Sequence, residues 1–421
     1  MPDTAIDVRG DAFLINGAPT YSEIDGSNAD AHGLLMNARF IQGVFDDRAG
    51  PERFVRFGHE TWDAEANTDR LISALPEWHA HGLRAFTVGL QGGGPVFTID
   101  DWRTIDNNPF GEDGHSFDDA YAGRLDRLIR GADAAGMAVI VSYLYASQGP
   151  RLRDGRAVRS AVATASSFLR DGGYTNVIIE VANEHNLGGF ANHPIIQSAE
   201  GITYLMDLAR RESGGMLVGC SGTGGYANRE VADASDILLI HGNGCSRQRY
   251  YNLTRTVKDY DLGRPIVCNE DSPCVSRLGV AYHTGTSWGY YNNLTKQEPP
   301  ADWSITEGED TFFARRMADG IGINLPALAA GDEYYLQGFE PDITVDGKRW
   351  VRLASLYPEK IDRVEYWHNG SRVYVAYDEP FFVNYRTTWI QDAIHERRDD
   401  REWRAVIYQT DEDVVEKVVT L

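Results

Sequence analysis

Short, nearly continuous runs of apolar residues recur through the middle of the chain, each a few positions after a glycine that follows a helical pattern. Ala85–Val88, Val139–Val141 and Val177–Ile179 are such runs. Glycine is favoured just past the end of a helix because it tolerates a positive φ. Strands that are apolar at consecutive positions suit a parallel sheet, whose strands are buried on both faces. The pattern therefore predicts repeated helix–strand units.

Eight such strands can be counted along the chain. Eight alternating strand–helix units within about 300 residues are typical of a (β/α)8 barrel, the α/β architecture also called a TIM barrel. A doubly wound open sheet is the alternative, but no GxGxxG motif follows the first strand. The strands are expected at about residues 34–40, 84–90, 137–143, 176–182, 216–220, 236–241, 265–269 and 287–291.

The segments between these strands show helical spacing of apolar residues. Helices are expected from Asn67, which is placed as an N-cap, from Ser116 and from Val158. Two later helices are expected at Arg247–Asp259 and Phe312–Ile321. Each has its apolar residues three or four positions apart, as a helix that packs one face on a sheet requires.

The two ends of the chain have a different pattern. Phe13–Thr20 contains an Asn-Gly pair between apolar residues, which predicts a hairpin. Beyond about residue 336 the apolar residues alternate, and Arg363–Trp367 and Arg372–Tyr377 flank a second Asn-Gly turn. These strands predict a small β-sandwich, with a strand-rich extension packed on the barrel as the alternative. The expected division is an N-terminal hairpin or extension at 1–30, a barrel at 31–335 and a C-terminal sandwich at 336–421.

The charge of the chain limits its partners. It has 62 acidic against 40 basic residues, a net charge of −22. Binding of nucleic acid or of an anionic membrane requires a basic face, so neither is expected as a main partner. No stretch approaches about 18 uninterrupted apolar residues, so no membrane span is expected. The first residues resemble no signal peptide, which predicts a cytoplasmic location, or secretion if a leader is missing from the sequence.

The four cysteines, Cys220, Cys245, Cys268 and Cys274, lack the paired CxxC spacing of a zinc site. Reduced thiols are expected, and a Cys245–Cys274 bridge remains an open alternative. We expect no metal and no organic cofactor.

Two glutamates follow predicted strands at positions where this fold usually has its catalytic residues. In a (β/α)8 barrel, catalytic groups lie at the C-terminal ends of the strands. Glu184 follows the fourth expected strand and Glu270 follows the seventh. These strands lie across the barrel from each other, so the two carboxylates can face one another over a cavity. Glycoside hydrolysis needs such a pair, about 5–5.5 Å apart for retention of configuration and about 6.5–9.5 Å apart for inversion.

Asn183-Glu184 after the fourth strand and Glu270 after the seventh resemble the signature of glycoside hydrolase clan A, whose members are retaining glycosidases on (β/α)8 barrels. The resemblance covers roughly residues 13–320 and is specific in these two motifs. It implies that Glu184 is the general acid/base, that Glu270 is the nucleophile and that Asn183 binds the hydroxyl next to the reacting carbon. Glu270 must then be ionised, whereas Glu184 must keep its proton, which a nearby like charge favours.

Further residues at the strand ends are candidates for substrate binding. His241 ends the sixth strand, and the aromatic residue usual after it in the clan is replaced by Gly242-Asn243. Trp288 on the eighth strand resembles the clan's aromatic floor for a sugar ring. Arg39 ends the first strand, where it would lower the pKa of Glu270. The other candidates are Gln91 after the second strand, Tyr143 and Tyr145 after the third, and Tyr290–Asn293, Trp62, Trp102 and Trp303 in loops.

The leading hypothesis is a retaining glycosidase acting on an oligosaccharide, a polysaccharide or another glycoside by double displacement. A non-catalytic carbohydrate-binding barrel is the first alternative, although the presence of both Glu184 and Glu270 argues against it. A metal-dependent lyase or isomerase is the second. That chemistry would need a larger cluster of acids and histidines, and His241 and Asp271 are the only obvious additions.

Overall fold

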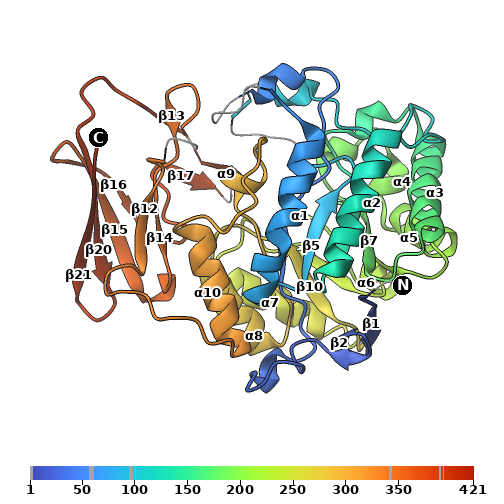
Figure 1. Cartoon of the computed structure of the whole chain (residues 1–421), viewed down its shortest axis with the longest axis horizontal. Coiled ribbons are helices and arrows are strands. Elements are labelled where there is room, and N and C mark those ends of the chain that lie inside the picture. The colour runs from blue at the N-terminus through green and yellow to red at the C-terminus, as the bar shows by residue number, and fades with distance from the viewer. Residues whose placement is uncertain are drawn as a thin grey trace.

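Eight short parallel strands run through the middle of the molecule, at the eight places where the sequence predicts them (Figure 1). In this computed structural model six of them form one sheet, in the order β11-β4-β5-β6-β7-β8, and β10 pairs with β9. The backbone of Ser287, just before β11, bonds to Ile266 and Cys268 of β10, so the two sheets meet at that edge. The strands are β4 (Asn37–Arg39), β5 (Ala85–Gly89), β6 (Ala138–Leu144), β7 (Val177–Ala182), β8 (Leu217–Gly219), β9 (Leu238–His241), β10 (Ile266–Glu270) and β11 (Gly289–Tyr290).

The structure describes residues 3–55, 61–93, 98–99, 101–340, 344–387, 390–391 and 393–421. The segment that follows Gln91 is therefore described only as far as Gly93. Within the described helices, none is long and apolar enough to cross a membrane. The four cysteines are all free and buried.

Alternate residues of the parallel strands belong to two different cores. On β6 and β7, Ile140 and Ile178 pack in an inner core with Phe13 of the N-terminal hairpin. Val141 and Ile179, one position further along, pack instead in the large core between strands and helices. The side chains of a strand alternate between its two faces, so the parity of a position decides whether its side chain faces inward.

Helices cover the outside of the parallel strands (Figure 1). Three of them begin at an aspartate whose side chain accepts a backbone N–H in the first turn, the usual N-cap arrangement. The first helix begins after Asp63, so the expectation of an N-cap at Asn67 is wrong; Asn67 is buried inside the helix and donates to the carbonyl of Gln42. The helices are α1 (Ala64–Ala80), α2 (Asp119–Ala134), α3 (Gly155–Gly172), α4 (Pro194–Gln197), α5 (Ala199–Glu212), α6 (Arg229–Ala234), α7 (Arg247–Lys258), α8 (Ser276–Thr284), α9 (Asn293–Lys296) and α10 (Glu309–Ile321).

The N-terminal segment forms the expected hairpin within a three-stranded sheet of β1 (Ile6–Arg9), β2 (Ala12–Ile15) and β3 (Ala18–Pro19). Asn16 and Gly17 both have positive φ, 53° and 82°, as the two central residues of a type I′ turn require. Phe13 of β2 is fully buried. The hairpin thereby fills one end of the inner core.

The C-terminal part is antiparallel, as the alternating pattern predicts. Its main sheet has four strands in the order β16-β15-β20-β21, and β12 pairs with β14. Leu336 and Leu353 of that pair share one apolar core with Val364 and Ile407 of the four-stranded sheet. The strands are β12 (Tyr334–Gln337), β13 (Lys348–Arg349), β14 (Arg352–Ser355), β15 (Ile361–His368), β16 (Ser371–Ala376), β17 (Tyr385–Thr387), β18 (Ile390–Gln391), β19 (Ile394–His395), β20 (Glu402–Gln409) and β21 (Val414–Thr420).

A buried ion pair joins the C-terminal strands to the helices of the parallel part. Arg352 of β14 lies 2.6 Å from Glu309 of α10, and both side chains are about 3% exposed. Tyr290 of β11 donates to Glu309 and to Asp310. In Figure 1, α10 and β14 lie side by side.

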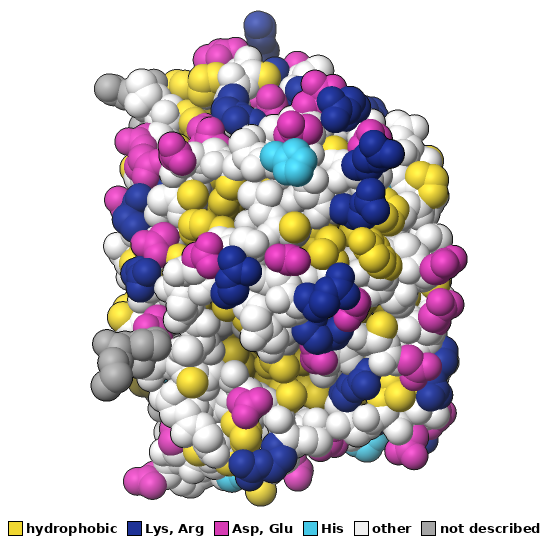
Figure 2. Space-filling model, turned by 90° about the vertical axis from the view of Figure 1, so that its right-hand side faces the viewer, with side chains coloured by type: hydrophobic (Ala, Val, Ile, Leu, Met, Phe, Trp, Pro, Cys, Tyr) yellow, Lys and Arg dark blue, Asp and Glu magenta, His cyan; other side chains and the backbone are white. Residues whose placement is uncertain are grey.

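The surface carries its excess of acidic residues without a basic patch on the side where α3–α5 lie. Figure 2 shows that face, with lysine and arginine side chains scattered among aspartates and glutamates. On this face, charges of both signs are therefore interspersed.

Candidate active site

A cavity of about 280 Å³ opens at the C-terminal ends of the parallel strands. Glu184 and Glu270 both line it, together with Arg39 and Asn243. Oxygen atoms of the two glutamates and a ring nitrogen of His241 lie within 4.8 Å of one another. The two carboxylates that the sequence singles out therefore share one cavity.

Arg39 connects the two motifs. Its Nε lies 2.8 Å from Oε2 of Glu270, and its Nη2 donates to Oδ1 of Asn183 at 2.8 Å. Asn243 donates to the other oxygen of Glu270, at 2.7 Å. The guanidinium also lies over the ring of Tyr291, with its carbon 5.5 Å from the ring centroid. Both oxygens of Glu270 are thus held by donors that favour a carboxylate.

The direction in which Glu270 points depends on an irregularity in β10. Cys268 pairs with Ile240 of β9, yet Glu270 pairs with His241, so two residues of β10 face one residue of its partner. Such a bulge inserts one residue and re-aims the side chains that follow it. Asn269 donates inward to Glu180, and Glu270 still reaches the cavity.

Glu184 sits just past β7 in an unusual backbone conformation. Its φ is 52°, in the left-handed region that few residues other than glycine adopt. Its backbone N–H donates to Oγ of Ser221, and its side chain accepts from Nδ1 of His241 at 3.1 Å. Strained backbone of this kind is common at functional sites.

His241 stands between the acidic groups of the site. It is fully buried, with Nδ1 3.8 Å from Oε2 of Glu270 and Nε2 3.9 Å from Oε1 of Glu180. Burial lowers the pKa of the imidazole, but attraction to Glu270, Glu180 and Glu184 outweighs this and raises it to about 10. The ring is therefore an imidazolium at neutral pH.

Glu180 is a third carboxylate that the sequence reading missed. It lies on β7, fully buried, and accepts from Nδ2 of Asn269 at 3.0 Å. Burial raises its pKa, but contacts with His241 and Arg39 reduce it to about 2. Its inward position was readable from the sequence, because a glutamate inside an otherwise apolar strand needs a buried partner.

The ionisation of Glu270 is finely balanced. Burial raises its pKa, Arg39 and His241 lower it, and Glu184 and Glu180 raise it again, so that it stays above the ordinary value for a glutamate. The expected lowering effect of Arg39 is present, but alone it does not bring the pKa below that ordinary value.

Trp288 does not form the floor of the cavity, which corrects the expectation from the sequence. Its ring is fully buried beside Tyr290 and Phe313, and its Nε1 donates to Asp271 at 2.7 Å. It belongs to the core between strands and helices. The aromatic side chains at the cavity are those of Tyr145 and Tyr291.

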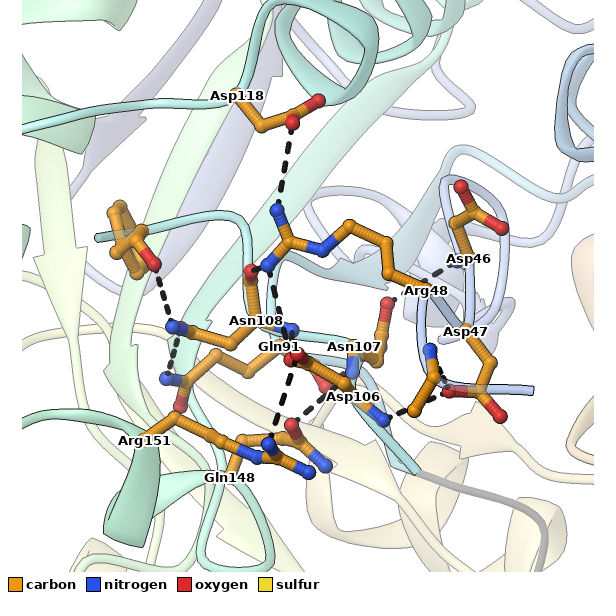
Figure 3. A network of polar contacts seen from close by, with 12 residues as sticks. Asp46, Asp47, Arg48, Gln91, Asp106, Asn107, Asn108, Asp118, Gln148 and Arg151 are labelled. Atoms are coloured by element: carbon orange, nitrogen blue, oxygen red, sulfur yellow. Dashed lines mark hydrogen bonds and ion pairs between the residues drawn. The ribbon is translucent and has the colours of Figure 1, made fainter. Parts of the chain in front are cut away.

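Tyr143 and Gln91 are likewise displaced from the cavity. Tyr143 lies on the helix-facing side of β6 and is 3.2 Å from Oγ of Ser166 on α3. Gln91 is buried in a network of loop residues (Figure 3), where it donates to Asn108 and accepts from the backbone of Tyr145. Both residues support the walls and do not line the cavity.

Several residues at the cavity were not predicted as contacts. Gln297, just after α9, lines one side beside Asn293, which belongs to the predicted run Tyr290–Asn293. Thr223 and Arg249 line another side, beyond β8 and at the start of α7. They lie in irregular loops or first helical turns, where side-chain direction has no periodic signal.

Glu184, His241 and Glu270 offer three donor atoms close enough together to be considered as a metal site. The other contacts of these residues argue against it. One oxygen of Glu270 faces a guanidinium and the other accepts from an amide, and His241 carries a proton. A cation would have to displace these donors, so the arrangement suits carboxylate chemistry better.

No model of a protein family matches the chain, and no curated protein does. Solved structures are similar. A candidate glycoside hydrolase from Bacteroides vulgatus matches 100% of this chain and 83% of its own, at 12% identity and TM-score 0.50. A β-mannanase from the blue mussel Mytilus edulis matches 77% of this chain and 99% of its own, at 12% identity and TM-score 0.47. A β-1,4-D-mannanase from Cryptopygus antarcticus matches 75% and 94%, at 12% identity and TM-score 0.48.

These structural neighbours are glycoside hydrolases, the class that the two glutamate motifs resemble. At 12% identity, the first of them shares the fold with this chain. This similarity concerns the fold alone.

Proposed function

We propose that this protein is a retaining glycoside hydrolase, with Glu270 as the nucleophile and Glu184 as the general acid/base. One observation carries the proposal: oxygen atoms of the two carboxylates lie within 4.8 Å of each other across one cavity, at the ends of β7 and β10. This separation is close to that of retaining enzymes, about 5–5.5 Å, and well below that of inverting ones, about 6.5–9.5 Å, so it favours double displacement.

The first half of the reaction uses the contacts around Glu270. Arg39 and Asn243 hold both of its oxygens, so the carboxylate is oriented before it attacks the anomeric carbon. Glu184 protonates the leaving oxygen as the glycosyl–enzyme bond forms. In the second half Glu184 takes a proton from water, which then attacks the anomeric carbon and releases Glu270.

The rest of the site fits a carbohydrate. Tyr145 and Tyr291 offer aromatic faces, while Asn243, Asn293 and Gln297 offer amide groups for hydroxyls. Asn183 is proposed to bind the hydroxyl next to the reacting carbon. Arg39 is proposed to bind the nucleophile Glu270. Trp288, Gln91 and Tyr143 are proposed as supporting residues.

The finer architecture belongs to the same proposal. We infer a closed (β/α)8 barrel, because Ser287 joins β10 to the edge of the larger sheet and Asp236, before β9, bonds to Val218 of β8. We infer a C-terminal sandwich from the apolar core shared by β12, β14 and the four-stranded sheet. The division at about residues 30 and 335 follows from these assignments.

Screening the purified protein on aryl glycosides and polysaccharides tests the function. Turnover of at least one substrate with retained anomeric configuration is expected, and the Glu270→Ala variant should lose it while keeping its circular dichroism spectrum. Wild-type activity in that variant would refute the nucleophile assignment. Binding of a sugar without turnover would favour a carbohydrate-binding barrel, and an inverted product would refute double displacement.

A further inference from the structure

The site contains more ionisable groups than glycoside hydrolysis requires. Beside Glu184 and Glu270 it holds Glu180, which the proposed mechanism does not use and which is fully buried. A buried glutamate is costly unless its charge is compensated. The question is what Glu180 contributes to the two carboxylates nearby.

The charges of the cluster balance in one arrangement. Arg39 and His241 supply two positive charges, and three carboxylates lie close to them. If Glu180 and Glu270 are ionised, they offset both cations, and the third carboxylate can keep its proton without leaving a buried charge uncompensated. Without Glu180, the cation of His241 would lack one of its compensating charges and would lose its proton more readily.

The geometry gives His241 the means to link the two glutamates of β7. Its Nδ1 donates to Glu184 at 3.1 Å and its Nε2 faces Glu180 at 3.9 Å, so opposite sides of one ring address the two carboxylates. Glu180 is fixed by the amide of Asn269, at 3.0 Å from Oε1. Asn269 faces inward by regular alternation after Cys268, and the bulge in β10 brings Glu270 to the same side, so adjacent residues serve the two carboxylates.

We propose that Glu180 is a positioning residue that holds His241 as an imidazolium, so that the proton shared between His241 and Glu184 is retained at neutral pH for transfer to the leaving group. The proposal rests on the assignment of Glu184 as the general acid. Removing the negative charge of Glu180 should release that proton at lower pH. The charged groups that face the ring are Glu180 on β7, Glu184 after β7 and Glu270 on β10. Those that face these carboxylates are Arg39 on β4, Tyr145 after β6, Cys220 after β8 and Tyr291 after β11.

The first test needs no substrate. A nuclear magnetic resonance titration of ring-labelled histidine follows His241, whose signal is identified by its absence in His241→Gln. The Glu180→Gln variant keeps the shape and the acceptor for Asn269 but loses the charge. Its His241 should titrate at a pH lower by about one unit or more, because an opposite charge at this range shifts a pKa by about 1–3 units.

Two variants control for structural effects. Glu180→Asp keeps the charge and should retain most of the raised titration. Glu365→Gln removes the charge of another buried glutamate, on β15, which contacts Arg363 and Arg372 and none of the groups named above. It should leave His241 unchanged. If Glu180→Gln moves the signal no more than Glu365→Gln does, the proposal is wrong.

The wild-type protein decides the question if Glu180→Gln does not fold. An imidazolium that persists above about pH 8 supports the proposal, since an unperturbed histidine loses its proton near pH 6.5. A neutral ring at about pH 7 overturns it, because there is then no cation for Glu180 to hold.

Kinetics supplies the second readout. In Glu180→Gln the basic limb of the pH profile of kcat/KM should move in the same direction as the titration, with KM little changed at the optimum. A titration that moves without any glycosidase activity in the wild type would leave the Glu180–His241 link intact and refute the proposed function. Glycosidase activity in the wild type, with no shift of the His241 titration in Glu180→Gln, would support the proposed function and refute the Glu180–His241 link.

Discussion

The Nε of Arg39 lies 2.8 Å from Oε2 of Glu270 in a site where both side chains are almost fully buried. This contact joins the end of the first parallel strand to the end of the seventh. It opposes the effect of burial, which raises the pKa of Glu270. The reactivity of the carboxylate therefore depends on a residue more than 200 positions away in the chain.

Replacing Arg39 by methionine should raise the pKa of Glu270 and abolish most activity. The side-chain stem is kept, but the charge that favours the carboxylate is lost. The acid limb of the pH profile of kcat/KM should rise by about 1–3 units, the range that an adjacent arginine accounts for. Arg84→Met is the control, because Arg84 is also buried but pairs with Glu23. An unmoved acid limb in Arg39→Met would contradict the assigned contact.

Replacing Glu184 by glutamine should affect substrates according to their leaving groups. A general acid contributes about 10²–10⁴-fold when the leaving group needs a proton. The loss in kcat/KM should be large for alkyl glycosides and small for aryl glycosides with acidic phenols. Equal losses on both series, measured in parallel, would argue that Glu184 does not donate the proton.

Trp288 and Tyr291 should respond differently to substitution. Trp288→Ala should cost about 3–5 kcal/mol of stability, as expected for a large aromatic side chain in a core, and it would also remove the indole donor to Oδ2 of Asp271. The milder Trp288→Phe should leave KM nearly unchanged. Tyr291→Ala should raise KM, because that ring lines the cavity. A large KM effect in Trp288→Phe would return Trp288 to the binding site.

Arg352→Met should destabilise the protein strongly. Breaking a buried ion pair by removing one partner typically costs about 3–5 kcal/mol, since the other charge is left uncompensated. Arg211→Met removes an arginine whose partner Asp207 is exposed, and it should cost under about 1 kcal/mol. Urea unfolding of the two variants gives the comparison. Equal stabilities would mean that the Arg352–Glu309 contact does not tie β14 to α10.

His241 should make stability depend on pH on the alkaline side. Its pKa is about 10 in the folded protein, above the 6.5 of an unperturbed histidine. The folded state thus holds a proton that the unfolded chain releases between these values, so the contribution is complete below about pH 6.5 and is lost as pH rises toward about 10. Unfolding free energies at about pH 6 and about pH 9.5 should differ less in His241→Gln than in the wild type.

The strands were predictable because their pattern depends on burial alone. Both faces of a parallel strand pack against apolar groups, so each strand is recognisable in the sequence as a short apolar run. Glu184 and Glu270 were found because they follow such runs. The helix start at Asp63 was missed because asparagine, like aspartate, is a favoured N-cap residue, which made Asn67 the expected cap. Only the hydrogen bond from its side chain to Gln42 shows that Asn67 is buried inside the helix.

The misplaced residues have a common physical cause. Tyr143 and Trp288 are aromatic residues of the kind found in sugar sites. Both side chains, however, pack in the core between strands and helices. Alternation along β6 would have indicated this for Tyr143, since Ile140 faces inward three positions earlier. The position of Gln91 could not be predicted for a different reason. Its partner Asn108 belongs to another loop, and a contact between loops leaves no periodic pattern in the sequence.

The unpaired residue in β10 has a consequence for how this protein can change. A loss of Asn269 would restore regular pairing and put Glu270 in the inward position that the amide now occupies, so the carboxylate would shift along the strand and Glu180 would lose its donor. Substitutions around the cavity can therefore accumulate gradually, whereas insertions and deletions in this strand act as all-or-none events. Among related chains, the length of the segment between Pro265 and Glu270 would be a better guide to retained chemistry than the identity of its residues.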